Sequence, residues 1–154
     1  MIRLFAPLAL ALAGCGYSTN ELLEHSAVTL RIIDNQDERR TQEFDLTRLV
    51  ARELAARGVH VNASDAPVAL EGTILQITEP SIVEGQSDVV VVGAVSVRLQ
   101  VVVRDRKTGR EISRRERVET ASFSSGRSES RQTARQEVFD RLARWVATSL
   151  ERDW

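Results

Sequence analysis

The sequence contains few of the residues that form catalytic or metal sites. Its single cysteine excludes a disulfide within the chain, so the fold must be held together by a hydrophobic core. Only two histidines are present, which leaves little material for a zinc site or a histidine base. The sequence has no glycine-rich phosphate loop and no G-x-S-x-G turn. These absences argue against an enzyme and predict neither a cofactor nor a bound metal.

The charge of the chain is balanced. The formal net charge is −1 over 154 residues, so there is no overall basic field of the kind that attracts nucleic acid. The length is typical of one domain, and the 42% share of hydrophobic residues is enough for one core. We therefore expect one folded domain with no nucleic-acid partner.

The first residues form the pattern of a secretory signal. Arg3 supplies a positive charge, the run from Leu4 to Ala13 is almost wholly apolar, and Gly14 and Cys15 follow. The apolar run is shorter than the roughly 20 residues that a membrane-spanning helix needs. The segment LAGC, which ends at Cys15, resembles a lipobox, the site read by lipoprotein signal peptidase. This resemblance implies cleavage before Cys15 and acylation of that cysteine.

Acylation of Cys15 predicts a membrane anchor. Bacterial lipoproteins typically carry two or three acyl chains, and more than one chain makes anchoring stable. Gly16, not Asp, follows the cysteine, which favours the outer membrane by the sorting rules of enterobacteria. We expect residues 1–14 to be a signal peptide, residues 15–26 a lipid-anchored tether, and residues 27–154 a single α+β domain on the periplasmic face of the outer membrane.

Hydrophobic periodicity in the mature chain predicts four strands and two helices. Alternating apolar residues predict strands over residues 28–32, 67–78, 89–104 and 110–123. Apolar residues recurring every three or four positions predict helices over residues 42–57 and from Ser128, a candidate N-cap, to about Leu150. Residues 34–41 and 79–88 are predicted as loops, and residues 59–65 as a short extended piece. The order β-α-β-β-β-α predicts an α+β fold, a two-layer sandwich of two helices on a mixed four-stranded sheet.

Local signals add detail to this outline. The apolar parity of the second strand changes at Leu75, which indicates a β-bulge. Gly58 and Gly109 stand where a helix end and a tight turn require positive φ, and Thr41 is a candidate N-cap for the first helix. The fourth strand is polar, which is typical of an edge strand or of a strand that faces water.

A basic cluster gathers around the turn between the last two predicted strands. Its members are Arg104, Arg106, Lys107, Arg110, Arg114 and Arg115. Arginine side chains suit phosphate and carboxylate groups, so the first four are candidates to contact an anionic lipid, a sugar phosphate or a partner. The interpretation that we favour is a solvated hairpin whose cations pair with Asp105, Glu111 and Glu116.

Three further arginines lie at the start of the last predicted helix: Arg127, Arg131 and Arg135. A cation at this end opposes the helix dipole. Some of them are therefore candidates for contact with a partner, although a solvated surface is the simpler interpretation.

Other polar groups are interpreted as structural. Asp34, Asp37 and Glu38 lie in a polar loop, and the sequence places no second acid or base beside them. His60 lies between two valines and is interpreted as a structural or solvated side chain.

The mature chain resembles the LptE family of lipopolysaccharide-assembly lipoproteins. The resemblance is a series of short pieces that lie in order over nearly the whole mature chain. They are Cys15-Gly-Tyr17 at the start, Ile33-Asp-Asn35 in the first strand and its loop, Leu46-Thr47 with Glu53-Leu54 in the first helix, Ala66 with Leu70-Glu-Gly-Thr-Ile74 in the second strand, and Leu99-x-Val101-x-Val103-Arg-Asp105-x-x-Thr108-Gly109 in the third strand and its turn. The chain departs from the family in having no proline within or just after the first strand, which indicates a distant branch.

The resemblance implies a plug protein. Family members have a two-layer α/β sandwich, sit inside the lumen of the large outer-membrane barrel LptD, support its assembly and help lipopolysaccharide reach the outer leaflet. They have no catalytic residues and no cofactor. Lipopolysaccharide itself is a further candidate ligand.

Two alternatives remain open at the level of sequence. One is another lipid-anchored periplasmic binding module, such as a secretion pilotin or a cell-wall synthase activator. Such modules usually have a long flexible linker after the cysteine, whereas the first strand here follows Cys15 closely. The other is a small hydrolase, for which the sequence offers no nucleophile or metal site.

Overall fold

The stretches with clear hydrophobic periodicity form the long elements of the fold. The structure, a computed structural model, describes residues 26–36, 42–84, 90–124 and 130–150. Its elements are β1 (Ala27–Leu30), β2 (Asp34–Asn35), α1 (Gln42–Ala56), β3 (His60–Val61), β4 (Val68–Thr78), β5 (Ser81–Glu84), β6 (Val90–Asp105), β7 (Glu111–Ser124) and α2 (Arg131–Thr148). The predicted 16-residue third strand is confirmed as β6.

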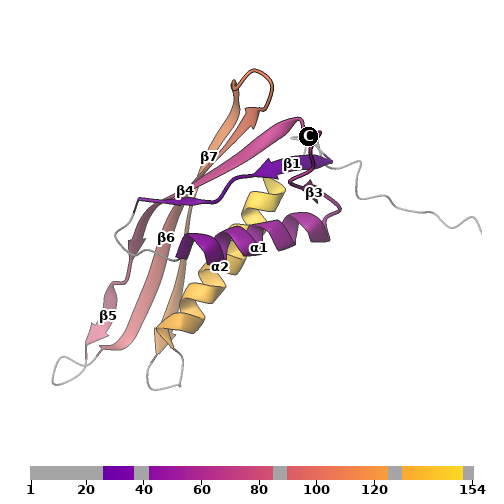
Figure 1. The fold of residues 1–154 in the computed structure, drawn as a ribbon. Coiled ribbons are helices and arrows are strands. Elements are labelled where there is room, and N and C mark those ends of the chain that lie inside the picture. The colour runs from indigo at the N-terminus through magenta and orange to yellow at the C-terminus, as the bar shows by residue number, and fades with distance from the viewer. Residues whose placement is uncertain (1–25, 37–41, 85–89, 125–129, 151–154) are drawn as a thin grey trace, which may run out of the picture.

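The strands form one mixed sheet. Neighbouring strands follow the order β3-β1-β4-β6-β5, while β2 also pairs with β4 and β7 pairs with β6. β1 and β2 run parallel to β4, and β6 runs antiparallel to β4, β5 and β7. Both helices cover one face of this sheet (Figure 1). The predicted α+β class with two layers is therefore confirmed.

The prediction of four strands was wrong, because the described residues form seven. Three additional strands have two to four residues and no usable periodicity. β2 lies in the predicted loop over residues 34–41 and pairs with β4, where the Gln36 N–H donates to the Ile74 carbonyl at 3.0 Å. β5 lies in the predicted loop over residues 79–88: the chain turns at Pro80 and continues along β6, where Ala94 N–H donates to the Pro80 carbonyl at 3.0 Å. β3 agrees with the predicted extended piece.

The start of α2 was also predicted wrongly. Ser130, not Ser128, is the N-cap, and its hydroxyl accepts from the Thr133 N–H at 3.1 Å.

Several predicted details are confirmed: the bulge at Leu75, and positive φ at Gly58 (79°) and Gly109 (70°). The N-cap proposed at Thr41 lies outside the described residues.

The core lies between the sheet and the helices. The odd-numbered residues of β6 from Val95 to Val103 are buried against it, as the alternation of the sequence predicts. They pack with the apolar stripes of both helices; fully buried members include Val97, Leu99, Leu46, Val138 and Leu142. Near the start of β6, the Phe123 ring lies over Gly93. A Cβ atom added to Gly93 would be only 2.5 Å from that ring.

The opposite face of the sheet carries the even-numbered residues of β6 and their neighbours on β4 and β7. We call this the open face, because both helices lie on the other side (Figure 1). Its charged members are Glu71, Arg98, Arg104, Glu111, Arg114 and Glu116. At one end, the β6–β7 hairpin extends beyond the helices.

Candidate functional site at the basic end of the hairpin

Asp105 organises the turn that joins β6 to β7. Its Oδ1 accepts hydrogen bonds from the backbone N–H of Lys107 at 3.0 Å and of Thr108 at 2.7 Å, and from the Thr108 hydroxyl at 2.8 Å. Gly109, with φ of 70°, donates its N–H to the Asp105 carbonyl at 2.8 Å. The hydrogen bonds from Thr108 hold the pKa of the Asp105 carboxyl below its ordinary value. The turn is therefore built around a carboxylate and keeps a fixed shape.

Arg104 and Arg114 are held by acids on the open face. The Arg104 Nε lies 3.0 Å from Glu71, and its Nη2 lies 3.5 Å from Glu111. Arg114 binds Glu111 through two nitrogens, at 2.9 and 2.7 Å, and donates to the Gln100 amide oxygen at 2.7 Å. The hydrogen bond from Arg114 lowers the pKa of Glu111, and Glu111 in turn raises the pKa of Arg114. These two arginines stabilise the hairpin.

Arg106 ties the turn to the segment before β4. Its guanidinium donates to the Ser64 carbonyl at 2.7 Å, and its backbone N–H donates to the Pro67 carbonyl at 2.9 Å. Lys107 and Arg110 are exposed, and neither has an ion-pair partner among the residues that the structure describes. Of the four predicted contact residues, the structure thus leaves two whose charge is available to a ligand.

The favoured interpretation of this hairpin is confirmed for Glu111, but not for Glu116, whose described ion-pair partner lies outside the cluster. Glu111 pairs with two of the cluster's arginines, and Glu116 pairs with Arg98 at 2.6 Å. The sequence did not identify Glu71, which also binds Arg31 at 2.8 Å. The signal that could have found it is the register of β4 against β6, because a long-range strand pairing places Glu71 beside Arg104.

The arginines at the start of α2 bind an acid of the same chain. Glu79, at the end of β4, lies 3.2 Å from Arg131 and 2.8 Å from Arg135. The Arg131 guanidinium also lies 6.0 Å from the centre of the Phe123 ring, at the limit of a cation–π contact. The suggestion that these cations are kept for a partner is therefore not needed for either residue. Arg127 lies outside the described residues.

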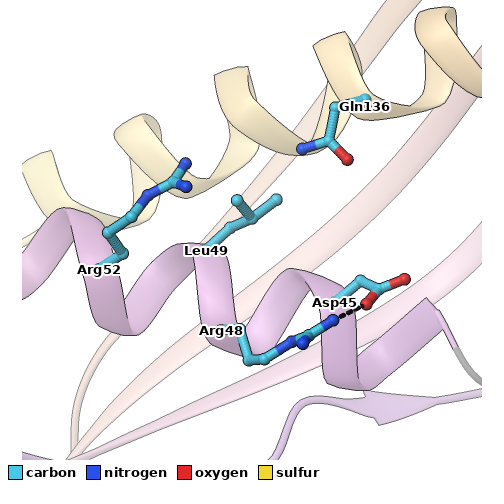
Figure 2. Close-up of a pocket in the computed structure, with 5 residues that line it drawn as sticks. All are labelled: Asp45, Arg48, Leu49, Arg52 and Gln136. Atoms are coloured by element: carbon cyan, nitrogen blue, oxygen red, sulfur yellow. Dashed lines mark hydrogen bonds and ion pairs between the residues drawn. The ribbon is translucent and has the colours of Figure 1, made fainter.

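A groove runs between the two helices. Its middle is a hollow of about 380 Å³ lined by four residues of α1 and by Gln136 of α2 (Figure 2). Leu49 forms its apolar floor, Arg48 pairs with Asp45 on the same helix, and Arg52 lies 3.7 Å from Asp140 across the groove. Ligand pockets are mostly apolar and enclosed. This open groove with paired charges is instead typical of a surface that contacts polar macromolecules or water.

The remaining sequence candidates form no site. Asp34 accepts from the Asn35 N–H, and His60 is exposed. Within the described part of the chain, no cluster of three or more His, Cys, Asp or Glu residues could hold a metal ion. No helix there is long and apolar enough to cross a bilayer. Cys15, Asp37 and Glu38 lie outside the described ranges.

Solved structures with the same fold include two proteins of bacteria. PelC of Paraburkholderia phytofirmans, a dodecamer, is 18% identical with a TM-score of 0.60, over 82% of this chain and 89% of that chain. A minor lipoprotein from Acinetobacter baumannii is 18% identical with a TM-score of 0.52, over 83% of this chain and 92% of that chain. At these identities the likeness shows the fold alone. No curated protein sequence matches this chain.

The family resemblance seen in the sequence is confirmed by comparison with protein-family models. The model that matches is that of LptE, described as lipopolysaccharide-assembly, and it covers residues 26–150. This span includes every helix and strand described above. The chain therefore belongs to the LptE family.

Proposed function

We propose that this protein is an outer-membrane lipoprotein that sits in the lumen of an LptD-type barrel, supports the assembly of that barrel, and so serves delivery of lipopolysaccharide to the outer leaflet. The observation that carries the proposal is the family match over residues 26–150. As a member of this family the chain is an assembly protein and not an enzyme.

The surface of the domain suits a polar lumen. The interior of a large outer-membrane barrel is polar and water-filled, so a plug must offer it polar surfaces. The open face meets this requirement with arginines and glutamates that neutralise one another, as Arg98 and Glu116 do at 2.6 Å. The helix side carries paired charges along its groove as well. Both layers can therefore face a polar wall with these charges paired.

Acylation of Cys15 is the second part of the proposal. β1 begins at Ala27, so the chain between the acylated cysteine and the sheet reaches about 40 Å at full extension. A tether of this length keeps the domain close to the membrane that holds its lipid. It suits a partner embedded in the same membrane, as a barrel is.

Contact with an anionic group at the hairpin end is the third part. The structure supports Lys107 and Arg110 for this role, because both are exposed and have no described ion-pair partner. Arg104 binds Glu71 and Arg106 binds the Ser64 carbonyl. These two arginines would shape the turn that presents Lys107 and Arg110. Lipid or lipopolysaccharide phosphate is the chemistry that such cations recognise.

Co-purification from the native host tests the barrel. The full-length protein, tagged at its C-terminus, is isolated from solubilised outer membranes, and a large β-barrel is expected to accompany it. The matched variant Cys15→Ala is expected to leave the outer-membrane fraction, because it cannot be acylated. If the wild-type protein is acylated and yet purifies without a barrel, the plug proposal fails while the anchor stands.

A further inference from the structure

The outer edge of β7 is the longest free strand edge in the described part of the chain. β7 has 14 residues and pairs on one side with β6, and no other described strand pairs with it. The other edge strands are short: β2 and β3 have two residues each and β5 has four. An unpaired edge presents backbone N–H and C=O groups to any extended chain that can reach it.

The register shows which groups point outward. Ala94 N–H donates to the Pro80 carbonyl, on the side of β6 that faces β4 and β5. Backbone groups alternate along a strand, so the odd-numbered residues of β6 face β7. Odd-numbered residues of β6 are paired with odd-numbered residues of β7, as Val97 is with Glu119. The odd-numbered residues of β7 therefore face β6, and its even-numbered residues direct their backbone N–H and C=O groups away from β6.

One part of this edge is already closed. The Arg141 guanidinium of α2 donates to the Thr120 carbonyl at 3.0 Å, and Glu137 binds Arg141. Arg141 thus occupies an outward carbonyl that an added strand would need. Beyond it, the outward backbone groups of Arg114, Glu116 and Val118 face no described strand. Two of the exposed large apolar side chains, Val118 (52%) and Ile112 (44%), lie along the same edge.

The charges along this stretch select the chain that can pair there. Residues 114–118 carry three arginines and one glutamate. Arg114 and Arg117 pair with Glu111 and Glu119 of the same strand, and Arg115 also has an interaction within the chain. Exposed pairs contribute little and do not exclude a second carboxylate. A partner strand with acidic side chains would place them opposite the arginines.

A second copy of this chain fits poorly at the same edge. A two-fold pairing is antiparallel and self-complementary. If the two-fold axis passes through Glu116, Arg115 of one copy lies opposite Arg117 of the other copy. If the axis passes through Arg115 or Arg117, that arginine lies opposite the same arginine of the other copy. Like charges directly opposite one another destabilise a sheet. Centred on Val118 it needs the region of Thr120, where Arg141 already lies.

We propose that an extended segment of a partner protein, with acidic side chains on one face and apolar side chains on the other, adds to the edge of β7 over residues 114–118. Its acids would meet Arg115 and Arg117 on the helix side, and its apolar side chains would lie beside Val118 on the open face. This inference goes beyond the proposed function and stands or falls independently of whether a barrel co-purifies.

Amide exchange with a synthetic peptide tests the added strand. The probe is a heptapeptide of alternating Glu and Val, added to the full chain in detergent. The amides of Arg114, Glu116 and Val118 are expected to exchange about tenfold more slowly, since each gains an acceptor. A peptide with Lys in place of Glu should leave their exchange unchanged.

Two variants sharpen the test. Val118→Pro removes an outward N–H without removing a bond to β6, because proline is tolerated where the N–H of an edge strand faces outward. It should weaken binding of the acidic peptide about tenfold, or about 1.4 kcal/mol, whereas Val118→Ala, which keeps the outward N–H and loses only part of the apolar contact, should weaken binding much less. Should Val118→Pro fail to fold, the comparison of the two peptides on the wild type still decides. Equal protection by both peptides, no protection, or protection at another strand edge would overturn the proposal.

Discussion

Replacing Glu79 by glutamine should destabilise the protein more than the loss of any single ion pair on the open face. Glu79 is the common acceptor of Arg131 and Arg135, at 3.2 and 2.8 Å, and its side chain is only 9% exposed. The substitution keeps the size of the side chain and removes its charge. Two cations of α2 then lose the carboxylate that holds the first turns of the helix against the end of β4.

The magnitude follows from burial. Removing a hydrogen bond to a charged group costs about 1.5–3 kcal/mol. Arg135 is 29% exposed and loses most of that, while Arg131 is 56% exposed and can be resolvated by water. We expect the free energy of unfolding to fall by about 2 kcal/mol, and the melting temperature by about 6 °C for a chain of this size.

Urea unfolding followed by circular dichroism measures this loss. Glu116→Gln is the matched control, because Glu116 and Arg98 are both about half exposed and such a pair is worth at most about 1 kcal/mol. Arg135→Gln should cost more than Arg131→Gln, in line with their exposure. If Glu79→Gln and Glu116→Gln lower the free energy of unfolding equally, the contacts of Glu79 with Arg131 and Arg135 do not stabilise the start of α2 as their distances indicate.

Three further results are expected. Leu99→Ala should lower the free energy of unfolding by about 3 kcal/mol in a urea titration, because it leaves a cavity in a fully buried part of the core. Gly93→Ala should cost about 1–3 kcal/mol by the same assay through its clash with the Phe123 ring, and much less in a Phe123→Ala background. The pKa values of Asp105 and Glu111 are lowered by folding, so the stability that they contribute is present above their ordinary values of 3.8 and 4.5 and is lost as the pH falls through the folded values. The protection of amides at the hairpin turn, taken relative to the intrinsic exchange rate at each pH, should accordingly fall below about pH 4, and protection that does not change with pH would contradict this assignment.

The sequence predicts the long elements because their periodicity is local. The alternation in β6 and the apolar stripe of α2 each repeat over many residues, and burial follows them directly. β2 and β5 could not be predicted, since two to four residues carry no period and their pairing depends on where β4 and β6 place their partners. Ser128 and Ser130 are both suitable N-caps, and only the three-dimensional path of the chain separates them.

For the charged residues too, the sequence predicts some features and only the three-dimensional fold determines the others. The sequence identifies six cations around the turn, but the register of β4 against β6 determines that Glu71 holds Arg104. Glu79 is far in sequence from the arginines of α2 that it binds. One signal did point to such an acid: α2 has no acidic residue in its first turn, although cations there oppose its dipole. A helix start of this composition indicates that an acid from elsewhere in the fold lies beside it.

The position of β1 would connect the proposed lipid anchor on Cys15 with the turn between β6 and β7 and its basic residues. Val28 of β1 is paired with Val68, and Val68 is paired with Asp105, where the turn begins. Neighbouring strands lie about 4.8 Å apart, so the chain enters the sheet about 10 Å across it from that turn and at the same end. Lipid on Cys15 would therefore hold this end of the sheet toward the membrane.

Anionic vesicles test this arrangement. In a Cys15→Ser variant, which cannot be acylated, flotation with vesicles that contain phosphatidylglycerol should depend on Lys107 and Arg110. Each basic residue near such a surface contributes about 1 kcal/mol, or about fivefold in binding, and the contribution falls with salt. Replacing either by serine should therefore weaken binding about fivefold, while Arg144→Ser, which removes an exposed cation from the helix groove, should not. If Arg144→Ser weakens binding as much as either hairpin variant, vesicle binding depends on the exposed cations of the whole surface, and Lys107 and Arg110 contribute no more than the others.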